Sequence, residues 1–328
     1  MPTWGETLKL LHDGAAKNGG AVPLDEIRRG ALTKLYDVTG RPTVLYASRW
    51  MQGGGAPEQV ILTLEDVQAF MEVLHGIPGP SIDLVVHSPG GSPTATEAIV
   101  NYIRTRFDDI RVFVPLAAMS AATMLACAAN RIVMGKHSFL GPTDPQLILQ
   151  TPLGVQSLPA AAIKMQFERA QADAANPQRF GAWVPMLQQY GPALLVQCDN
   201  VLQLSKSLVS TWLEQWMFAD LEDAKAAAKV TSDKLNSHEE HGVHDRYLSR
   251  AELRDSTRLV IDDLEEDQQL QDAVLSVLHA ATHTFAIATP VQKIVENHLG
   301  KSFIKNAAAI VPPPGARQII PAPGQKQS

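Results

Sequence analysis

Strand-like runs and helical segments alternate along the first half of the chain, and this alternation restricts the fold more than any other feature. The strand-like runs are rich in β-branched residues and lie at 43–47, 82–86, 110–114 and 131–134. The amphipathic or apolar helical segments between them lie at 63–74, 94–106 and 119–129. Successive strands joined by helices pair in parallel through right-handed crossovers. The sequence therefore predicts an α/β fold with a buried parallel sheet.

The second half is predicted to be mostly helical. Helices are expected at 219–229, 249–254 and 266–283, the second of them with a capping box formed by Ser249 and Glu252. An apolar stripe at helical spacing indicates core or subunit interface, and it consists of Val201, Leu204, Leu208, Val209, Trp212, Leu213 and Trp216.

Three regions are expected along the chain. Residues 1–40 form a helical lead-in, residues 41–305 one catalytic-type domain, and residues 306–328 a Pro-rich tail that is predicted to be disordered.

Composition excludes some classes of protein. A chain of 328 residues with 45% hydrophobic and 19% charged residues can bury a full core. Its net charge of −6 and pI near 5.9 argue against a nucleic-acid partner, because binding to phosphate backbones needs clustered Lys and Arg.

Two cysteines, Cys127 and Cys198, are too few for a disulfide framework and fit a reducing compartment. No signal-peptide pattern is present. The uncharged segment 112–130 is interrupted by Pro115 and dominated by alanine, so it indicates a buried strand followed by a buried helix and not a membrane span. We expect a cytoplasmic protein with no transmembrane segment.

Two motifs one βα unit apart carry the chemistry. Ser88–Gly91 follows a buried strand, and Ala118–Thr123 lies where the next strand enters a helix. Adjacent glycines allow backbone N–H groups to approach a substrate oxygen, and a serine at a helix start lies beside unpaired N–H donors. The pair of motifs predicts acyl transfer through Ser120.

These motifs, together with the segment Gly141–Gln146, resemble the serine dehydrogenase proteinase family. That family is related to signal peptide peptidase A and, more distantly, to the proteolytic subunit of Clp protease. The resemblance extends from about residue 40 to 305 and implies a crotonase-like fold of stacked βα turns in a homo-oligomer. It also implies a peptide or protein substrate that acylates a serine, with no cofactor.

Carried over residue by residue, the resemblance makes Ser120 the nucleophile. Gly90 and Gly91 then form the turn that supplies the oxyanion hole, and the N–H of Ala121 is its second donor. A serine endopeptidase is therefore the expected activity.

The motifs that indicate the Ser120 nucleophile do not identify its general base. Thr143 stands where Clp-type subunits have their histidine, and Asp245 resembles the Clp aspartate. Because the peptidase A branch uses a lysine, the resemblance favours a Ser–Lys dyad with Lys164 as the base. Lys136 and Lys206 are the rival lysines.

Histidines supply further candidates. His87, at a strand end beside the glycine turn, is an accessory candidate, as is Asp245. The cluster 238–244 and the pair His279 and His283 have metal-like spacing, but a solvated loop and helix packing are the favoured interpretations, so no metal is expected. No Gly-x-Gly-x-x-Gly motif follows a strand, which leaves nicotinamide binding without support.

Two other functions stay open at this stage. A crotonase-type acyl-CoA enzyme would use the same oxyanion hole to stabilise an enolate without a serine nucleophile. A catalytically silent assembly or binding module would use neither group.

Overall fold

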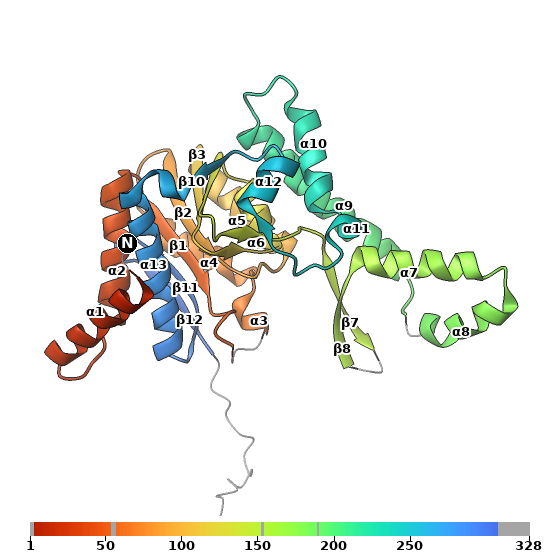
Figure 1. Ribbon diagram of the computed structural model, residues 1–328, viewed down its shortest axis with the longest axis horizontal. Helices are drawn as coiled ribbons and strands as arrows, with labels where there is room; N and C mark the ends of the chain where they lie inside the picture. The colour runs from red at the N-terminus through yellow and green to blue at the C-terminus, as the bar shows by residue number, and fades with distance from the viewer. Residues whose placement is uncertain (1–2, 54–56, 152–153, 189, 308–328) are drawn as a thin grey trace, which may run out of the picture.

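The structure of the protein is a computed structural model that describes residues 3–53, 57–151, 154–188 and 190–307. Its main sheet contains β1 Thr43–Ser48, β2 Ser81–His87, β3 Asp109–Val114, β5 Arg131–Met134, β10 Ile261–Asp263, β11 Val291–Asn297 and β12 Ser302–Asn306. These seven strands are ordered β10-β5-β3-β2-β1-β11-β12 (Figure 1). The first five in that order pair in parallel, and β11 and β12 extend the sheet with antiparallel pairing.

Two smaller β structures accompany the main sheet. A three-stranded sheet of order β4-β6-β9 joins β4 Ala117–Ala118, β6 Phe139–Leu140 and β9 Leu248–Ser249. A hairpin consists of β7 Gln146–Thr151 and β8 Gly154–Pro159.

Helices cover both faces of the main sheet. In the first half they are α1 Trp4–Lys17, α2 Leu24–Thr39, α3 Pro57–Val60, α4 Glu65–Leu74, α5 Pro93–Arg104 and α6 Ala121–Cys127. In the second half they are α7 Ala160–Asp173, α8 Pro177–Leu187, α9 Leu194–Trp212, α10 Ala224–Leu235, α11 His238–His241, α12 Arg250–Ser256 and α13 Gln268–Ile287. A π-helical turn, Leu213–Met217, continues α9, and a 3-10 turn, Leu264–Glu266, precedes α13.

The strands alternate their side chains between two apolar cores. Leu45, Val85 and Phe113 pack under α2 and α13, whereas Val44 and Val112 face the core that contains α4, α5, α6 and α9. Burial on both faces explains why the strands read as nearly continuous apolar runs. The sheet is therefore covered on each side, and its strand ends position the functional residues.

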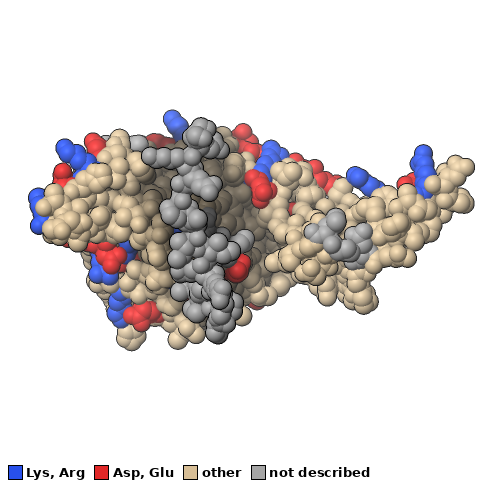
Figure 2. Space-filling model, turned by 90° about the horizontal axis from the view of Figure 1, so that it is seen from below, with Lys and Arg blue, Asp and Glu red and all other residues tan. Residues whose placement is uncertain are grey.

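An arm formed by β7, β8, α7 and α8 projects from this body (Figure 1). The same side projection is visible from below, where acidic and basic side chains are intermixed over the surface (Figure 2). A small separate apolar core, the arm core, joins the arm to α9 and contains Ile163 of α7 with Leu194 and Cys198 of α9.

The predicted α/β fold with a parallel sheet is confirmed, and so is the N-cap at Ser249, whose side chain accepts the Glu252 N–H. The Trp212 stripe is confirmed as core: Trp212 is buried, and the Arg104 guanidinium lies 4.2 Å from the centre of the Trp216 ring. The Pro-rich tail lies almost wholly outside the described residues, and the domain boundaries stay a prediction.

Three parts of the sequence-based prediction were wrong or incomplete. The helix expected at 219–229 spans 224–235 instead, because residues 218–223 form turns after the π-helical segment. The antiparallel pair β11 and β12 was not anticipated, and neither was the hairpin of β7 and β8.

In the described part of the chain, no helix is long and apolar enough to cross a membrane.

Candidate active site

Ser120 occupies a sharp turn between β4 and α6. Its backbone has φ 51° and ψ −118°, a conformation that residues with a Cβ rarely adopt, and its side chain is partly exposed. Strain of this kind is often held at functional sites, and a serine on a strand-to-helix turn presents its hydroxyl to substrate. The backbone geometry thus distinguishes Ser120 from an ordinary packing serine.

The turn is held by the residues around it. The Thr123 hydroxyl lies 2.7 Å from the Ala118 carbonyl oxygen and 2.9 Å from the Gly141 carbonyl oxygen, and it accepts the Gly141 N–H at 3.0 Å. Every residue of α6 is buried, and small alanine side chains allow this helix to lie close to its neighbours. Thr123 therefore joins the start of α6 to both β4 and the segment after β6.

Gly90 and Gly91 bring a second backbone segment against Ser120. A Cβ at Gly90 would lie 2.8 Å from the Ala121 nitrogen and 2.8 Å from the Ser120 Cβ, so a larger residue collides with the serine turn. A Cβ at Gly91 would overlap the backbone of Leu62, lying 2.9 Å from its Cα. Both glycines also have positive φ, 92° and 153°.

Two backbone N–H groups at this junction have no acceptor within the described residues. The Gly90 N–H lies 3.2 Å from the Ser88 hydroxyl, which accepts it. Within the described ranges, neither the Gly91 N–H nor the Ala121 N–H donates to a protein acceptor. A tetrahedral intermediate needs donors of this type beside the nucleophile.

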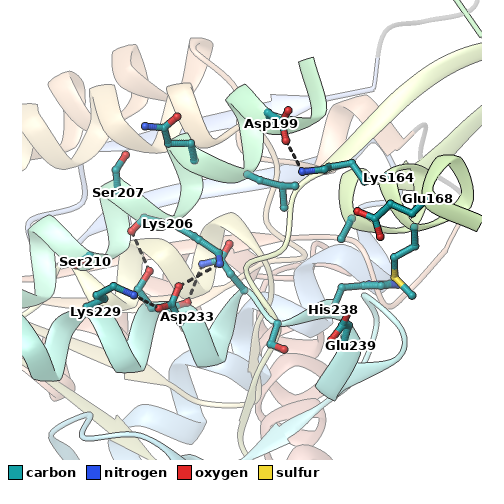
Figure 3. Close-up of a pocket in the computed structure, with 17 residues that line it drawn as sticks. Lys164, Glu168, Asp199, Lys206, Ser207, Ser210, Lys229, Asp233, His238 and Glu239 are labelled. Carbon is teal, nitrogen blue, oxygen red and sulfur yellow. Dashed lines mark hydrogen bonds and ion pairs between the residues drawn. The ribbon is translucent and has the colours of Figure 1, made fainter. Parts of the chain in front are cut away.

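Lys164 lies on α7, in the arm. Its Nζ forms a hydrogen bond and ion pair with Asp199 of α9, and this bond is the main cause that raises the pKa of Lys164. Both side chains line a pocket of about 860 Å³ between α7, α9 and α10 (Figure 3). Ser120 is not among the residues that line this pocket. A general base must be neutral, so this environment does not favour the role, and Lys164 as the base stays a prediction.

The rival lysines also lie in solvated positions. Lys206 lines the same pocket and pairs with Asp233 at 3.1 Å, and Lys136 is exposed on the turn after β5. Neither has the desolvated setting that a neutral amine needs.

His87 lies at the end of β2 and is 1% exposed. Burial lowers its pKa to about 4, and the nearby Ala117 carbonyl offsets only part of this effect. Neither ring nitrogen makes a regular hydrogen bond with a described residue, and the ring centroid lies 5.6 Å from that of Trp50. His87 is therefore a neutral group at pH 7, and its accessory role stays a prediction.

The sequence motifs did not predict a role for Asp144. Its carboxylate is 1% exposed, and its two oxygens lie 2.8 Å from His244 Nδ1 and 3.1 Å from His238 Nδ1. Two histidines of the 238–244 cluster thus orient toward a buried carboxylate. The described residues contain no group of three or more His, Cys, Asp or Glu side chains placed to hold a metal ion.

The two positions compared with the Clp pattern differ in their surroundings. The Thr143 hydroxyl is buried and has no partner in the described structure. Asp245 is exposed, and the described residues give it no hydrogen bond or ion pair. Asp144 itself could have been singled out from the sequence, because it belongs to the segment Gly141–Gln146 that carries the family resemblance.

Comparisons with known proteins match the part of the chain that contains these residues. Residues 52–180 match the family model of the ClpP-like SDH-type serine proteinases. Two uncharacterized proteins of Methanocaldococcus jannaschii are each 34% identical to the chain, over 125 and 94 residues. The alignments cover 38% and 28% of this chain, and the chain spans only 41% and 32% of the length of these relatives.

Solved structures similar to this chain include two variants of the 1510-N membrane-bound stomatin-specific protease, one of them in complex with a substrate peptide. They are 13% and 14% identical, cover 61% of this chain and 74% and 69% of their own, and give a TM-score of 0.36. Because that score is low, the assignment depends on the sequence match. The matched segment carries the glycine turn, Ser120 and Lys164, and over residues 52–180 the resemblance to the serine dehydrogenase proteinase family is confirmed.

Proposed function

We propose that the protein is a serine peptidase in which Ser120 is the nucleophile. The observation that carries the proposal is the strained Ser120 turn, which packs against Gly90 next to the Ala121 nitrogen. Gly91 follows Gly90 in the same turn and supplies the other N–H that has no described acceptor. The match to a serine proteinase family supports a peptide or protein as the substrate.

The proposed reaction uses these groups in sequence. Ser120 Oγ loses its proton to a base and attacks the peptide carbonyl carbon, forming a tetrahedral intermediate. The Gly91 and Ala121 N–H groups donate hydrogen bonds to its oxyanion. Collapse releases the amine, which takes the proton from the base, and water then hydrolyses the Ser120 ester by the reverse proton transfers.

Lys164 is the proposed base, on the strength of its match to the family pattern. In the structure it is paired with Asp199, so the proposal requires Lys164 to leave that partner and lose solvent before it accepts a proton. The pocket around Lys164 would lose water when substrate or another subunit fills it.

Labelling with a fluorophosphonate distinguishes this proposal from the two alternative functions. A fluorophosphonate phosphonylates only an activated serine, whose oxygen displaces fluoride from phosphorus, so an acyl-CoA enzyme of the crotonase type or a silent assembly module would not be labelled. We also propose a cytoplasmic location, for which two free, buried cysteines give support.

The first test replaces the nucleophile. Ser120→Ala should abolish peptide hydrolysis and fluorophosphonate labelling, while the urea unfolding midpoint stays close to that of the wild type, because only one hydroxyl is removed. Ser276→Ala is the matched control, since Ser276 bonds only within α13. Full labelling of Ser120→Ala, with the modified residue mapped elsewhere, would contradict the assignment.

A second test separates backbone strain from collision at the glycine turn. Gly90→Ala and Gly79→Ala both place alanine at positive φ, 92° and 85°, and this backbone strain alone should cost each about 1–2 kcal/mol of stability. Only the Gly90 Cβ would meet the serine turn, since no atom lies within 4 Å of a Cβ at Gly79. We expect kcat/KM to fall about 100-fold or more in Gly90→Ala alone. Equal activity of the two variants would argue against a role for the turn.

The base proposal predicts a pH effect. Because Asp199 is the largest cause of the raised pKa of Lys164, Asp199→Asn should lower that pKa. Activity that needs neutral Lys164 rises as pH increases through the pKa, so the acid limb of the kcat/KM profile should move to lower pH. Lys164→Ala should remove acylation about as fully as Ser120→Ala. Near wild-type turnover by Lys164→Ala would place the base elsewhere.

A homo-oligomer is also proposed, supported by the hairpin in the arm. One hairpin face packs Leu147, Leu149 and Leu158 against the arm core, while Ile148 and Val155 on the other face are 73% and 69% exposed. Light scattering at micromolar concentration should give a multiple of 35.6 kDa. The double change Ile148→Ser and Val155→Ser should lower that mass, and Val230→Ser, on exposed α10, should not. An active wild-type monomer would refute the proposal.

A further inference from the structure

A buried ion pair lies behind the glycine turn. Lys293 of β11 and Asp66 of α4 are 0% and 1% exposed, and Lys293 Nζ lies 2.8 Å and 2.7 Å from the two carboxylate oxygens of Asp66. The Tyr46 hydroxyl also donates to Asp66, at 3.1 Å. Buried ion pairs contribute little net stability compared with apolar residues of similar size. The pair therefore calls for an explanation other than stability.

The two charged groups hold the backbone on both sides of Leu62. Lys293 Nζ donates to the Ile61 carbonyl oxygen at 2.7 Å, and the Thr63 N–H donates to Asp66 at 2.8 Å. This segment lies outside the regular strands and joins short α3 to α4. The ion pair therefore holds residues 61–63 from the side opposite the glycine turn, while the buried Leu62 side chain packs in the core.

Leu62 in turn holds the oxyanion turn. Its N–H donates to the Gly90 carbonyl oxygen at 2.7 Å, and its own carbonyl oxygen accepts the Ser92 N–H at 3.0 Å. These two bonds enclose Gly91, whose Cα lies so close to Leu62 that no Cβ fits. A shift of residues 61–63 would move the Gly91 N–H directly.

We infer that Lys293 and Asp66 are positioning residues, which act through Leu62 to fix the Gly91 N–H at the place where the oxyanion of the reaction develops. The inference rests on the proposed function of Ser120. Donors to an oxyanion act through preorganised geometry, so a small displacement of Gly91 should affect the transition state more than substrate binding.

The test compares two buried ion pairs on the same strand. Asp66→Asn weakens the pair behind the oxyanion turn, and Glu296→Gln weakens the buried Arg28–Glu296 pair, which contacts α2 instead. Both variants should lower the urea unfolding midpoint. Only Asp66→Asn should lower kcat and the fluorophosphonate labelling rate, by about 10- to 100-fold, with KM within about twofold of the wild type.

Tyr46→Phe provides a milder variant if Asp66→Asn does not fold. It removes one hydrogen bond to Asp66 without changing charge, and we expect kcat to fall by about threefold with KM unchanged. A wild-type kcat in whichever of these two variants folds, or an equal loss of kcat in Glu296→Gln, would overturn the positioning role while Ser120 is still labelled in the wild type. A wild-type Ser120 that the probe does not label would overturn the proposed function, and the positioning role with it.

Discussion

The candidate site depends on the close approach of three backbone segments that are distant in sequence: residues 61–63, 88–92 and 118–121. Hydrogen bonds from Leu62 hold the first segment to the second, and the second is held to the third where Met119 N–H donates to the Ser88 carbonyl oxygen at 2.9 Å. Such an approach leaves no room for a Cβ at positions 90 and 91 of the middle segment. Glycine at positions 90 and 91 is thus required before Ser120 and the N–H donors can meet.

The strain at Ser120 is opposed by contacts that hold its turn in place. A residue in an unfavourable backbone region costs about 1–3 kcal/mol. The Thr123 hydroxyl links the turn to two neighbouring segments, and each such hydrogen bond contributes about 1 kcal/mol. Burial of the whole of α6 adds to this. The fold therefore holds the partly exposed Ser120 in this strained conformation.

The sequence predicted those elements whose apolar periodicity is strong. Strands β1, β2, β3 and β5 and their parallel pairing follow from runs of buried aliphatic residues. The short motifs at the glycine turn and Ser120 predict where the candidate site lies. Strand β11 was missed because Lys293, Glu296 and Asn297 are polar, although all its residues are buried. Their burial depends on partners from α2, α4 and the loop before α4, which no local pattern indicates.

The two lysines of greatest interest show why a base is hard to identify from sequence alone. Lys164 is solvated and paired, and its pKa is raised. Lys293 is buried, and its pKa is lowered by desolvation, which is the change that a lysine base needs. Yet an ammonium has three N–H donors, and those of Lys293 face three acceptors, the Ile61 carbonyl oxygen and both oxygens of Asp66.

Loss of the proton from Lys293 would leave Asp66 as a buried charge without its partner, so the protonated form is the one that this structure satisfies. Burial alone does not create a base, because the acceptors around the amine decide which protonation state is stable. By the same argument, Lys164 becomes a base only in a state where Asp199 no longer accepts its hydrogen bond. The sequence pattern can place a lysine at that position, but contacts that would release it from Asp199 depend on tertiary or subunit packing, which no local pattern encodes.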